Sequence, residues 1–192
     1  TEHAANLFGL KEFGNIYSRL GNPTVGALEA RLTALEEGAM CVALSSGTSA
    51  VMYSLINIMS QGDNFVTANQ LYGGTYTMFD NILPEYGINS KKVDITDLKA
   101  VEEAIDDKTR AIYCETITNP GLVVADISAL ADIAHSKGIP LIVDATFTTS
   151  AILKPFEYGA DIVVYSLTKW MSGHGRVIAG AVIEKGGFDW GN

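Results

Sequence analysis

Short apolar runs alternate with segments of helical periodicity along nearly the whole chain. Uncharged apolar runs predict buried strands, and apolar residues three and four positions apart predict helices with one buried face. The pair Asn22-Pro23 predicts a helix start, because Asn is a good N-cap and Pro fits the first helical position. Beyond this helix, which we expect to end at Gly38, the pattern predicts helices at residues 48–60, 75–83, 97–105 (capped by Thr96) and 127–136, and strands at residues 40–44, 64–68, 91–95, 111–114, 139–143, 162–165 and 177–183.

The alternation of strands and helices predicts the fold class. Strands that are apolar throughout are typical of a parallel sheet with helices on both faces. We therefore expect an α/β protein with three layers, α/β/α, and a mostly parallel sheet. Ligands of such sheets bind outside the carboxyl ends of the strands, so chemistry is expected in the residues that follow each strand.

An uncharged run from Gly38 to Gly62 is long enough to be mistaken for a membrane helix. The polar stretch from Ser45 to Ser49 interrupts this run. We therefore expect a short strand and a helix joined by a turn, both buried in the core.

The charge balance narrows the classes of partner. The chain has 192 residues, with 13 Lys and Arg against 22 Asp and Glu, which leaves a formal net charge of −9. An acidic chain without a basic stripe is not expected to bind nucleic acid or an anionic membrane surface. Cys41 and Cys114 both lie in apolar runs, which favours buried thiols and a reducing, cytoplasmic location.

The residues at three strand ends each have two interpretations, one as a binding or catalytic group and one as a purely structural group. The turn Ser46-Gly47-Thr48 precedes a helix, so it suits a phosphate as well as a simple helix cap. Asp144 after an apolar strand either caps the next turn or pairs with a ligand cation. Lys169 is either a solvated surface charge or a desolvated lysine that forms a Schiff base.

Their order along the chain adds information. A phosphate-binding turn, the aromatic Tyr72, the pair Asn119-Pro120, a strand-end Asp and a strand-end Lys follow one another. Pyridoxal 5′-phosphate needs such a set: a phosphate site, a ring stack, a partner for its pyridinium nitrogen and a lysine. The alternative from a different class is a non-catalytic α/β module that binds a nucleotide or phosphate.

These motifs resemble the Cys/Met-metabolism family of fold-type I pyridoxal-phosphate enzymes, and the resemblance covers essentially the whole chain. It implies that Lys169 forms the Schiff base, Asp144 pairs with the pyridine nitrogen and Tyr72 stacks on the ring. The other residues that we expect to contact the cofactor on this ground are Ser46, Gly47, Thr48, Asn119, Thr146, Ser166 and Thr168.

The resemblance also implies a site shared between subunits. Tyr17 and Arg19 match a pair that reaches the phosphate of the neighbouring subunit, although an ordinary interface pair remains an alternative. Residues 1–22 are then part of an N-terminal arm, and residues 23–192 are the cofactor-binding large domain. The expected assembly is a homotetramer built from dimers.

Within the family, residues 71–76, 115–117 (Glu115-Thr116-Ile117) and 187–190 look most like the matching segments of O-acetylhomoserine sulfhydrylases. The implied reaction is γ-replacement, in which O-acetyl-L-homoserine and sulfide give L-homocysteine and acetate. Cystathionine γ-synthase and methionine γ-lyase are the alternatives, and Gly74 argues against the lyase, which typically has Cys there. Ala145, Tyr165 and Thr48 depart from the usual family residues and put hydrogen bonding around the cofactor in doubt.

An amino-acid substrate brings a carboxylate, which an arginine receives best. The four arginines are Arg19, Arg31, Arg110 and Arg176, and only Arg176, after the lysine, is a weak candidate. The family uses an arginine of a smaller C-terminal domain, which we expect this chain to lack. The resemblance therefore predicts an incomplete enzyme.

Overall fold

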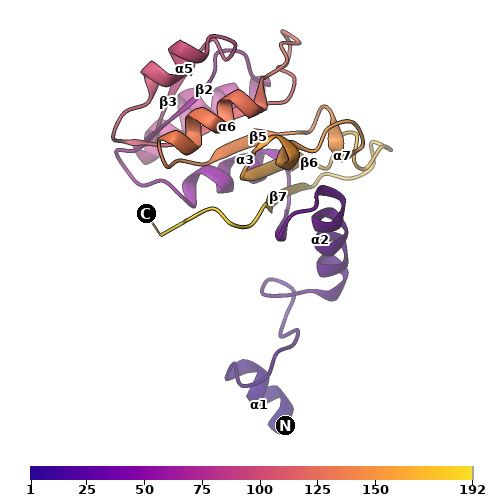
Figure 1. The fold of residues 1–192 in the computed structure, drawn as a ribbon. Coiled ribbons are helices and arrows are strands. Elements are labelled where there is room, and N and C mark those ends of the chain that lie inside the picture. The colour runs from indigo at the N-terminus through magenta and orange to yellow at the C-terminus, as the bar shows by residue number, and fades with distance from the viewer. Residues whose placement is uncertain (192) are drawn as a thin grey trace.

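The computed structural model describes residues 1–191. Its described part contains a seven-stranded sheet with the strand order β1-β7-β6-β5-β4-β2-β3 (Figure 1). Neighbouring strands are parallel except that β7 runs antiparallel to both β1 and β6. The strands are β1 (Met40–Leu44), β2 (Asn64–Ala68), β3 (Asn89–Val93), β4 (Thr109–Glu115), β5 (Leu141–Asp144), β6 (Ile162–Ser166) and β7 (Gly180–Glu184).

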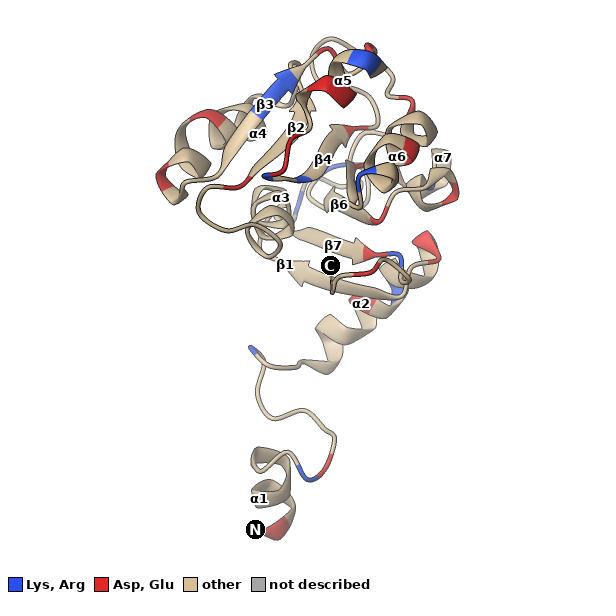
Figure 2. Cartoon of the chain, turned by 60° about the vertical axis from the view of Figure 1, so that its left-hand side comes forward, with Lys and Arg blue, Asp and Glu red and all other residues tan. Residues whose placement is uncertain are grey.

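Helices lie on both faces of this sheet. In Figure 2, α5 and α6 cover one face and α3 and α4 cover the other, so the expectation of three layers is confirmed. The helices are α1 (Glu2–Phe8), α2 (Pro23–Glu36), α3 (Gly47–Ile56), α4 (Gly73–Thr77), α5 (Leu98–Ala104), α6 (Ile127–Ser136) and α7 (Thr149–Ile152), with a π turn at Met78–Ile82 and 3-10 turns at Leu83–Tyr86 and Pro155–Tyr158.

The α2 helix starts where the sequence predicts. Oδ1 of Asn22 accepts hydrogen bonds from the backbone N–H groups of Thr24 at 2.9 Å and Val25 at 3.2 Å. These bonds satisfy two of the donors that a helix start leaves free. The helix ends at Glu36, and Glu37 takes a left-handed conformation with φ of 58° before Gly38.

The uncharged run from Gly38 to Gly62 forms β1, a turn and α3, as expected from its polar interruption. β1 lies at the edge of the sheet, and α3 packs against β6 and β7. Within residues 1–191, no helix is both long and apolar enough to cross a membrane.

Several predicted element boundaries were wrong. The helix expected at residues 48–60 ends at Ile56, because the chain turns and the carboxylate of Asp63 accepts the N–H of Ser60 at 2.9 Å. Thr96 is not a helix cap: Oδ1 of Asp94 binds its N–H and hydroxyl, and Asp97 caps α5 instead.

Other elements begin or end at different residues than predicted, and for the strands the pairing within the sheet explains the difference. The strand expected at 91–95 is β3 at 89–93, because it pairs in register with β2 and then turns at Asp94. Pairing with β1 and β6 starts only at Gly180, so residues 177–179 are loop. The helix expected at 75–83 is part of a longer helical segment, 73–86, of three successive geometries.

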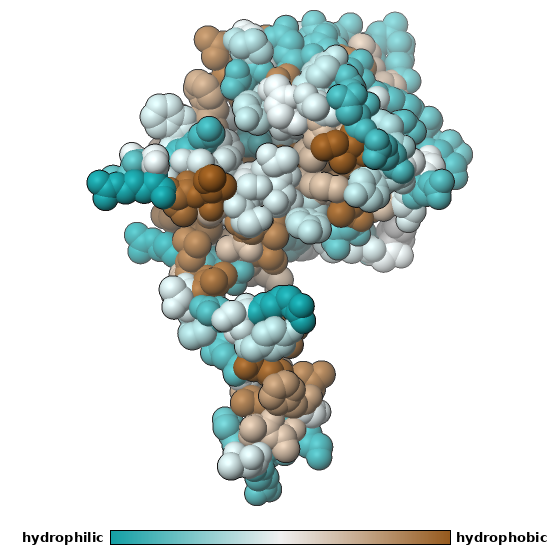
Figure 3. Space-filling view, turned by 180° about the vertical axis from the view of Figure 1, so that it is seen from behind, coloured by the Kyte–Doolittle hydropathy of each residue, from teal (hydrophilic) through white to brown (hydrophobic). Residues whose placement is uncertain are grey.

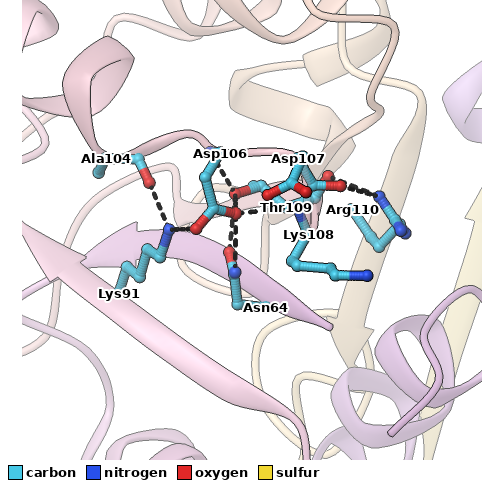
Figure 4. A network of polar contacts seen from close by, with 8 residues as sticks. All are labelled: Asn64, Lys91, Ala104, Asp106, Asp107, Lys108, Thr109 and Arg110. Carbon is cyan, nitrogen blue, oxygen red and sulfur yellow. Dashed lines mark hydrogen bonds and ion pairs between the residues drawn. The ribbon is translucent and has the colours of Figure 1, made fainter. Parts of the chain in front are cut away.

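The amino ends of β2, β3 and β4 are joined by polar contacts around Asp106 (Figure 4). Its carboxylate accepts hydrogen bonds from Nζ of Lys91 at 2.5 Å, Nδ2 of Asn64 at 3.0 Å and the N–H of Lys108 at 2.9 Å. The Lys91 contact, followed by Asn64, lowers the pKa of Asp106. Charge pairing therefore stabilises the amino ends of these strands. The cleft described below lies at their carboxyl ends.

Residues 1–22 project away from the body of the molecule (Figure 1). Figure 3 shows apolar surface along this projecting segment. Tyr17 and Arg19 belong to this segment, are exposed and contact each other, with the guanidinium carbon 5.2 Å from the ring centre. The exposed large apolar residues of the segment are Phe8, Leu10, Phe13, Tyr17 and Leu20.

Candidate active site

A cleft of about 670 Å³ opens at the carboxyl ends of the parallel strands. This is the position that the strand topology predicts for a ligand. Tyr17 and Arg19 do not line the cleft of their own chain. The ten predicted site residues that the cleft brings together are Ser46, Gly47, Thr48, Tyr72, Asn119, Asp144, Thr146, Ser166, Thr168 and Lys169.

The turn before α3 combines a helix cap with an open anion site. Oγ of Ser46 accepts the N–H of Ser49 at 3.0 Å, which confirms the capping interpretation. The N–H groups of Gly47 and Thr48 belong to the first helical turn and therefore have no intrahelical acceptor. With the positive end of the helix dipole, they provide donors for a phosphate at the cleft wall.

Glycine at position 47 is required by the close approach of β6. A Cβ on Gly47 would lie 2.4 Å from Cβ and 2.7 Å from Cα of Ser166. A Cβ on Gly180 would likewise lie 2.0 Å from the carbonyl oxygen of Ser46. These two glycines let the α3 turn pack directly against the end of β6 and the start of β7, which forms a cradle of backbone groups.

Asp144, the last residue of β5, lines the cleft, and its carboxylate accepts two hydrogen bonds. Its Oδ1 accepts the N–H of Thr146 at 2.9 Å, so it does stabilise the next turn. Its Oδ2 accepts the hydroxyl of the buried Tyr113 at 3.3 Å. Desolvation by the surrounding protein raises the pKa of the Asp144 carboxyl.

No lysine, arginine or histidine of the described chain forms an ion pair with Asp144. A desolvated carboxylate at a ligand cleft favours a cationic ligand group. This observation and the cradle at Gly47 fit the two ends of pyridoxal phosphate, which are a protonated pyridine nitrogen and a phosphate.

Thr146 and Thr168, two of the predicted cofactor contacts, use their hydroxyls in hydrogen bonds within the protein. Oγ1 of Thr146 accepts the N–H of Ser166 at 2.7 Å, which fixes the end of β6 beside Asp144. Oγ1 of Thr168 donates to the carbonyl of Ala179 at 3.2 Å and accepts its N–H at 3.1 Å. These hydroxyls hold the loop around the lysine in place.

Lys169 lies in the turn after β6, and its side chain is exposed at the cleft. Within residues 1–191 Lys169 is exposed to solvent, so this part of the chain does not desolvate it, and its role in a Schiff base stays a prediction. Its backbone N–H donates to the carbonyl of Ser166 at 3.1 Å, which ties its position to the end of β6. Lys169 and Asp144 therefore line the same cleft.

Tyr72 and Asn119 border the cleft from two other loops, and both are exposed. Tyr72 precedes α4, and a Cβ on Gly74 would lie 2.6 Å from its ring atom Cε1. A side chain at position 74 would therefore displace the tyrosine ring. Asn119 follows β4 and lines the cleft, and its backbone N–H donates to Glu115.

Sequence reasoning missed Glu115 as a site residue. This carboxylate is 6% exposed, and its oxygens accept the N–H groups of Tyr72 at 2.7 Å and Asn119 at 3.0 Å. Burial, followed by the nearby charge of Asp144, raises the pKa of Glu115 to about 7. The signals in the sequence are its place directly after a predicted strand and its membership of the family-like segment Glu115-Thr116-Ile117.

Tyr165, a departure from the family pattern, does not disturb the cleft. It is fully buried and donates its hydroxyl to Oε1 of Glu36 at the end of α2. Glu36 is also fully buried. The Tyr165 side chain thus supports packing of α2 on the sheet, and it is absent from the cleft lining.

None of the four arginines lines the described cleft. Arg110 lies near the opposite end of the sheet, where it pairs with Asp63 at 3.1 Å. Arg176 is exposed in the loop after Lys169 and does not reach the cleft lining. The chain therefore offers no guanidinium for a substrate carboxylate at this position.

The cleft has the features of a pyridoxal-phosphate site. It combines a backbone cradle for phosphate, a carboxylate without a paired cation and an exposed lysine. The chain belongs to the Cys/Met metabolism PLP-dependent enzyme family, whose match covers residues 1–192. It is 48% identical to O-acetyl-L-homoserine sulfhydrylase of Leptospira meyeri over 192 residues, which are 100% of this chain and 43% of that protein.

Solved structures agree with this membership. A crystal structure from Campylobacter jejuni that contains N′-pyridoxyl-lysine-5′-monophosphate superposes with a TM-score of 0.92 at 43% identity, over 98% of this chain and 46% of that one. O-acetylhomoserine sulfhydrylase of Wolinella succinogenes gives a TM-score of 0.83 at 41% identity, over 88% and 49% of the two chains. The fold-type I prediction is confirmed, and the chain spans less than half the length of these relatives.

Proposed function

We propose that the protein containing this chain uses pyridoxal 5′-phosphate to replace the acetoxy group of O-acetyl-L-homoserine by sulfide, giving L-homocysteine and acetate. One observation carries the proposal: Lys169, Asp144 and the Gly47 cradle converge on one cleft in a chain that is 48% identical throughout to a named O-acetyl-L-homoserine sulfhydrylase. The comparisons give no support to the non-catalytic phosphate-binding alternative.

Different residues of the cleft would bind different parts of the cofactor. The N–H groups of Gly47 and Thr48, with the hydroxyls of Ser46 and Ser166, would receive the phosphate. The carboxylate of Asp144 would hold a proton on the ring nitrogen. Other groups at the cleft complete the pocket: the Tyr72 ring would stack, and the Asn119 amide would face the ring's substituents.

When bound, pyridoxal phosphate supplies an electron sink for negative charge that develops on the carbon atoms of the substrate. Nζ of Lys169 would hold the cofactor and, once released by the amine of the substrate, would remove the proton at Cα. Tyr72, which lines the cleft and is exposed, would move a proton near Cγ, from which acetate leaves.

The substrate carboxylate needs a receiver beyond the described cleft lining, because that lining holds no arginine. We propose that another part of the protein supplies it. We also propose that residues 1–22 form an arm and residues 23–192 the large domain. The projection of the arm, with Tyr17 and Arg19 exposed on it, supports contact with a neighbouring subunit.

We propose a homotetramer in which dimers share their active sites. The exposed apolar residues of the arm support such an assembly, since isolated apolar side chains gain from burial in an interface. The two cysteines are buried and free, which is compatible with the cytoplasmic location that we propose.

The test is an assay of the protein containing this chain with O-acetyl-L-homoserine and sulfide. We expect homocysteine and acetate in equal amounts, and none from the Lys169→Ala variant. Replacing sulfide by L-cysteine tests for cystathionine γ-synthase, and L-methionine alone tests for methionine γ-lyase. Faster turnover in either of these reactions would replace the proposed one.

A further inference from the structure

One carboxylate joins two loops of the cleft that come from different strands. Glu115 ends β4, and its oxygens accept the N–H of Tyr72, after β2, at 2.7 Å and the N–H of Asn119, after β4, at 3.0 Å. The residue is 6% exposed, so these bonds are largely shielded from water. The tyrosine loop and the asparagine loop are thus connected through a single group.

The protonation state of that group decides whether both bonds can form well. An ionised carboxylate offers acceptors only, on both oxygens. A protonated carboxyl carries a hydrogen on one oxygen, and this oxygen becomes a poor partner for a second N–H donor. Protonation of Glu115 therefore weakens both bonds, because each loses the charge that strengthens it and one oxygen also gains a hydrogen.

Several titratable groups face Glu115. Asp144 occupies the paired position on β5, and both residues line the cleft, so two like charges lie side by side. Tyr113 and Cys114 on β4 lie within electrostatic range. The phenol of Tyr72 and the ammonium of Lys169 border the same cleft. Burial and the charge of Asp144 raise the pKa of Glu115 to about 7, against the effect of its two N–H donors.

We propose that Glu115 is a positioning residue: its ionised carboxylate fixes the Tyr72 and Asn119 loops together, and its protonation loosens both at once. The inference deepens the proposed function and rests on it for its consequence, because these loops carry the residues that would face the cofactor. Near neutral pH a small change in acidity would then change the order of both cofactor-contacting loops.

The first test needs no cofactor. In the ¹⁵N-labelled 192-residue chain, the backbone amide signals of Tyr72 and Asn119 are followed by NMR from about pH 5 to about pH 9. We expect both amides to titrate with one common midpoint near 7. Two different midpoints, or no titration of either amide, would overturn the proposal.

Variants identify the group that titrates. In Glu115→Gln the common titration should disappear, and in Asp144→Asn its midpoint should move to lower pH because the neighbouring negative charge is removed. Glu29→Gln is the matched control, since Glu29 also accepts a backbone N–H, that of Ala43 at 2.9 Å, but from α2 and away from the cleft. A titration that persists in Glu115→Gln contradicts the assignment.

The affinity for pyridoxal phosphate, measured at two pH values, is the second test. If Glu115 had a purely structural role, its replacement would weaken binding equally at both. We expect Glu115→Gln to weaken pyridoxal phosphate binding about tenfold at about pH 8 and by less than about twofold at about pH 5.5, where the wild-type loops are already loosened. An equal effect at both pH values would count against the proposal. If the amides titrate together but the cofactor does not bind, the proposed function fails and the loop connection stands.

Discussion

Gly47 and Ser166 approach each other so closely that a Cβ on Gly47 would lie 2.4 Å from the Cβ of Ser166. The contact joins the start of α3 to the end of β6, and both partners line the cleft. Because the neighbouring atoms include backbone, the clash cannot be relieved by rotating a side chain. The α3 turn can therefore lie this close to β6 only because residue 47 is a glycine.

Gly47→Ala should lower the free energy of unfolding by about 1–3 kcal/mol, as overpacking of a tight contact does. It should also weaken binding of pyridoxal phosphate, because α3 has to move away from Ser166. Urea unfolding and a cofactor titration measure the two effects. Gly26→Ala in α2 is the control: a Cβ there meets nothing within 4 Å, so a gain of about 0.5–1 kcal/mol is expected. Equal stability of the two variants would contradict this account.

Asp144→Asn should separate charge from shape. Asn preserves the size of the side chain and an acceptor for the N–H of Thr146, but it cannot stabilise a protonated pyridine nitrogen. With ¹⁵N-labelled pyridoxal phosphate, we expect the ring nitrogen to give the chemical shift of a protonated ring in the wild-type chain and of a neutral ring in the variant. Identical shifts in both proteins would rule out the proposed role of Asp144.

Asp106→Asn should reduce stability in a manner that depends on pH. The contacts of Asp106 lower its pKa, so its contribution is complete above the unfolded-state pKa of about 3.9 and is lost as the pH falls below that value. Urea midpoints of wild type and variant should therefore differ at neutral pH and converge in acid. Asp107→Asn is the control, since only the backbone carbonyl of Asp107 bonds to Arg110. A difference that persists in acid would show that charge pairing is not its cause.

Arg19 should act on the site of a neighbouring subunit. It is exposed on the projecting segment and does not line its own cleft. In the protein containing this chain, Arg19→Ala and Lys169→Ala subunits should each be inactive, and mixed dimers should regain one intact site. Activity of the mixture is compared with that of each variant after the same unfolding and refolding. Hybrids that form without regaining activity would place the phosphate site within one chain.

Much of the fold could be predicted because its signals are local. The Asn22-Pro23 start of α2 and the bounds of α6 at Ile127–Ser136 depend on capping and periodicity within a few residues. The ends of parallel strands also lie at one edge by geometry alone, and this placed Asp144 and Lys169 in the same cleft.

The rest depends on contacts between distant parts of the chain. The bond from Glu115 to the Tyr72 loop requires β2 to lie beside β4, and strand order cannot be read from periodicity. The partner of Tyr165 is Glu36, 129 positions away, so its role in packing α2 could not be predicted from its neighbours. The exposure of Lys169 depends on what covers the cleft, and the sequence around the lysine does not encode that cover.

The central claim is that Lys169 binds the cofactor, and borohydride reduction tests it most directly. The 192-residue chain is mixed with pyridoxal phosphate, reduced with borohydride and digested, and the pyridoxyl-lysine is located by mass spectrometry. We predict one stable adduct on Lys169, and none on that peptide in Lys169→Ala, with the folded state of the variant confirmed by circular dichroism. A principal adduct on Lys154 or Lys185, or no adduct in the wild-type chain, would contradict the account.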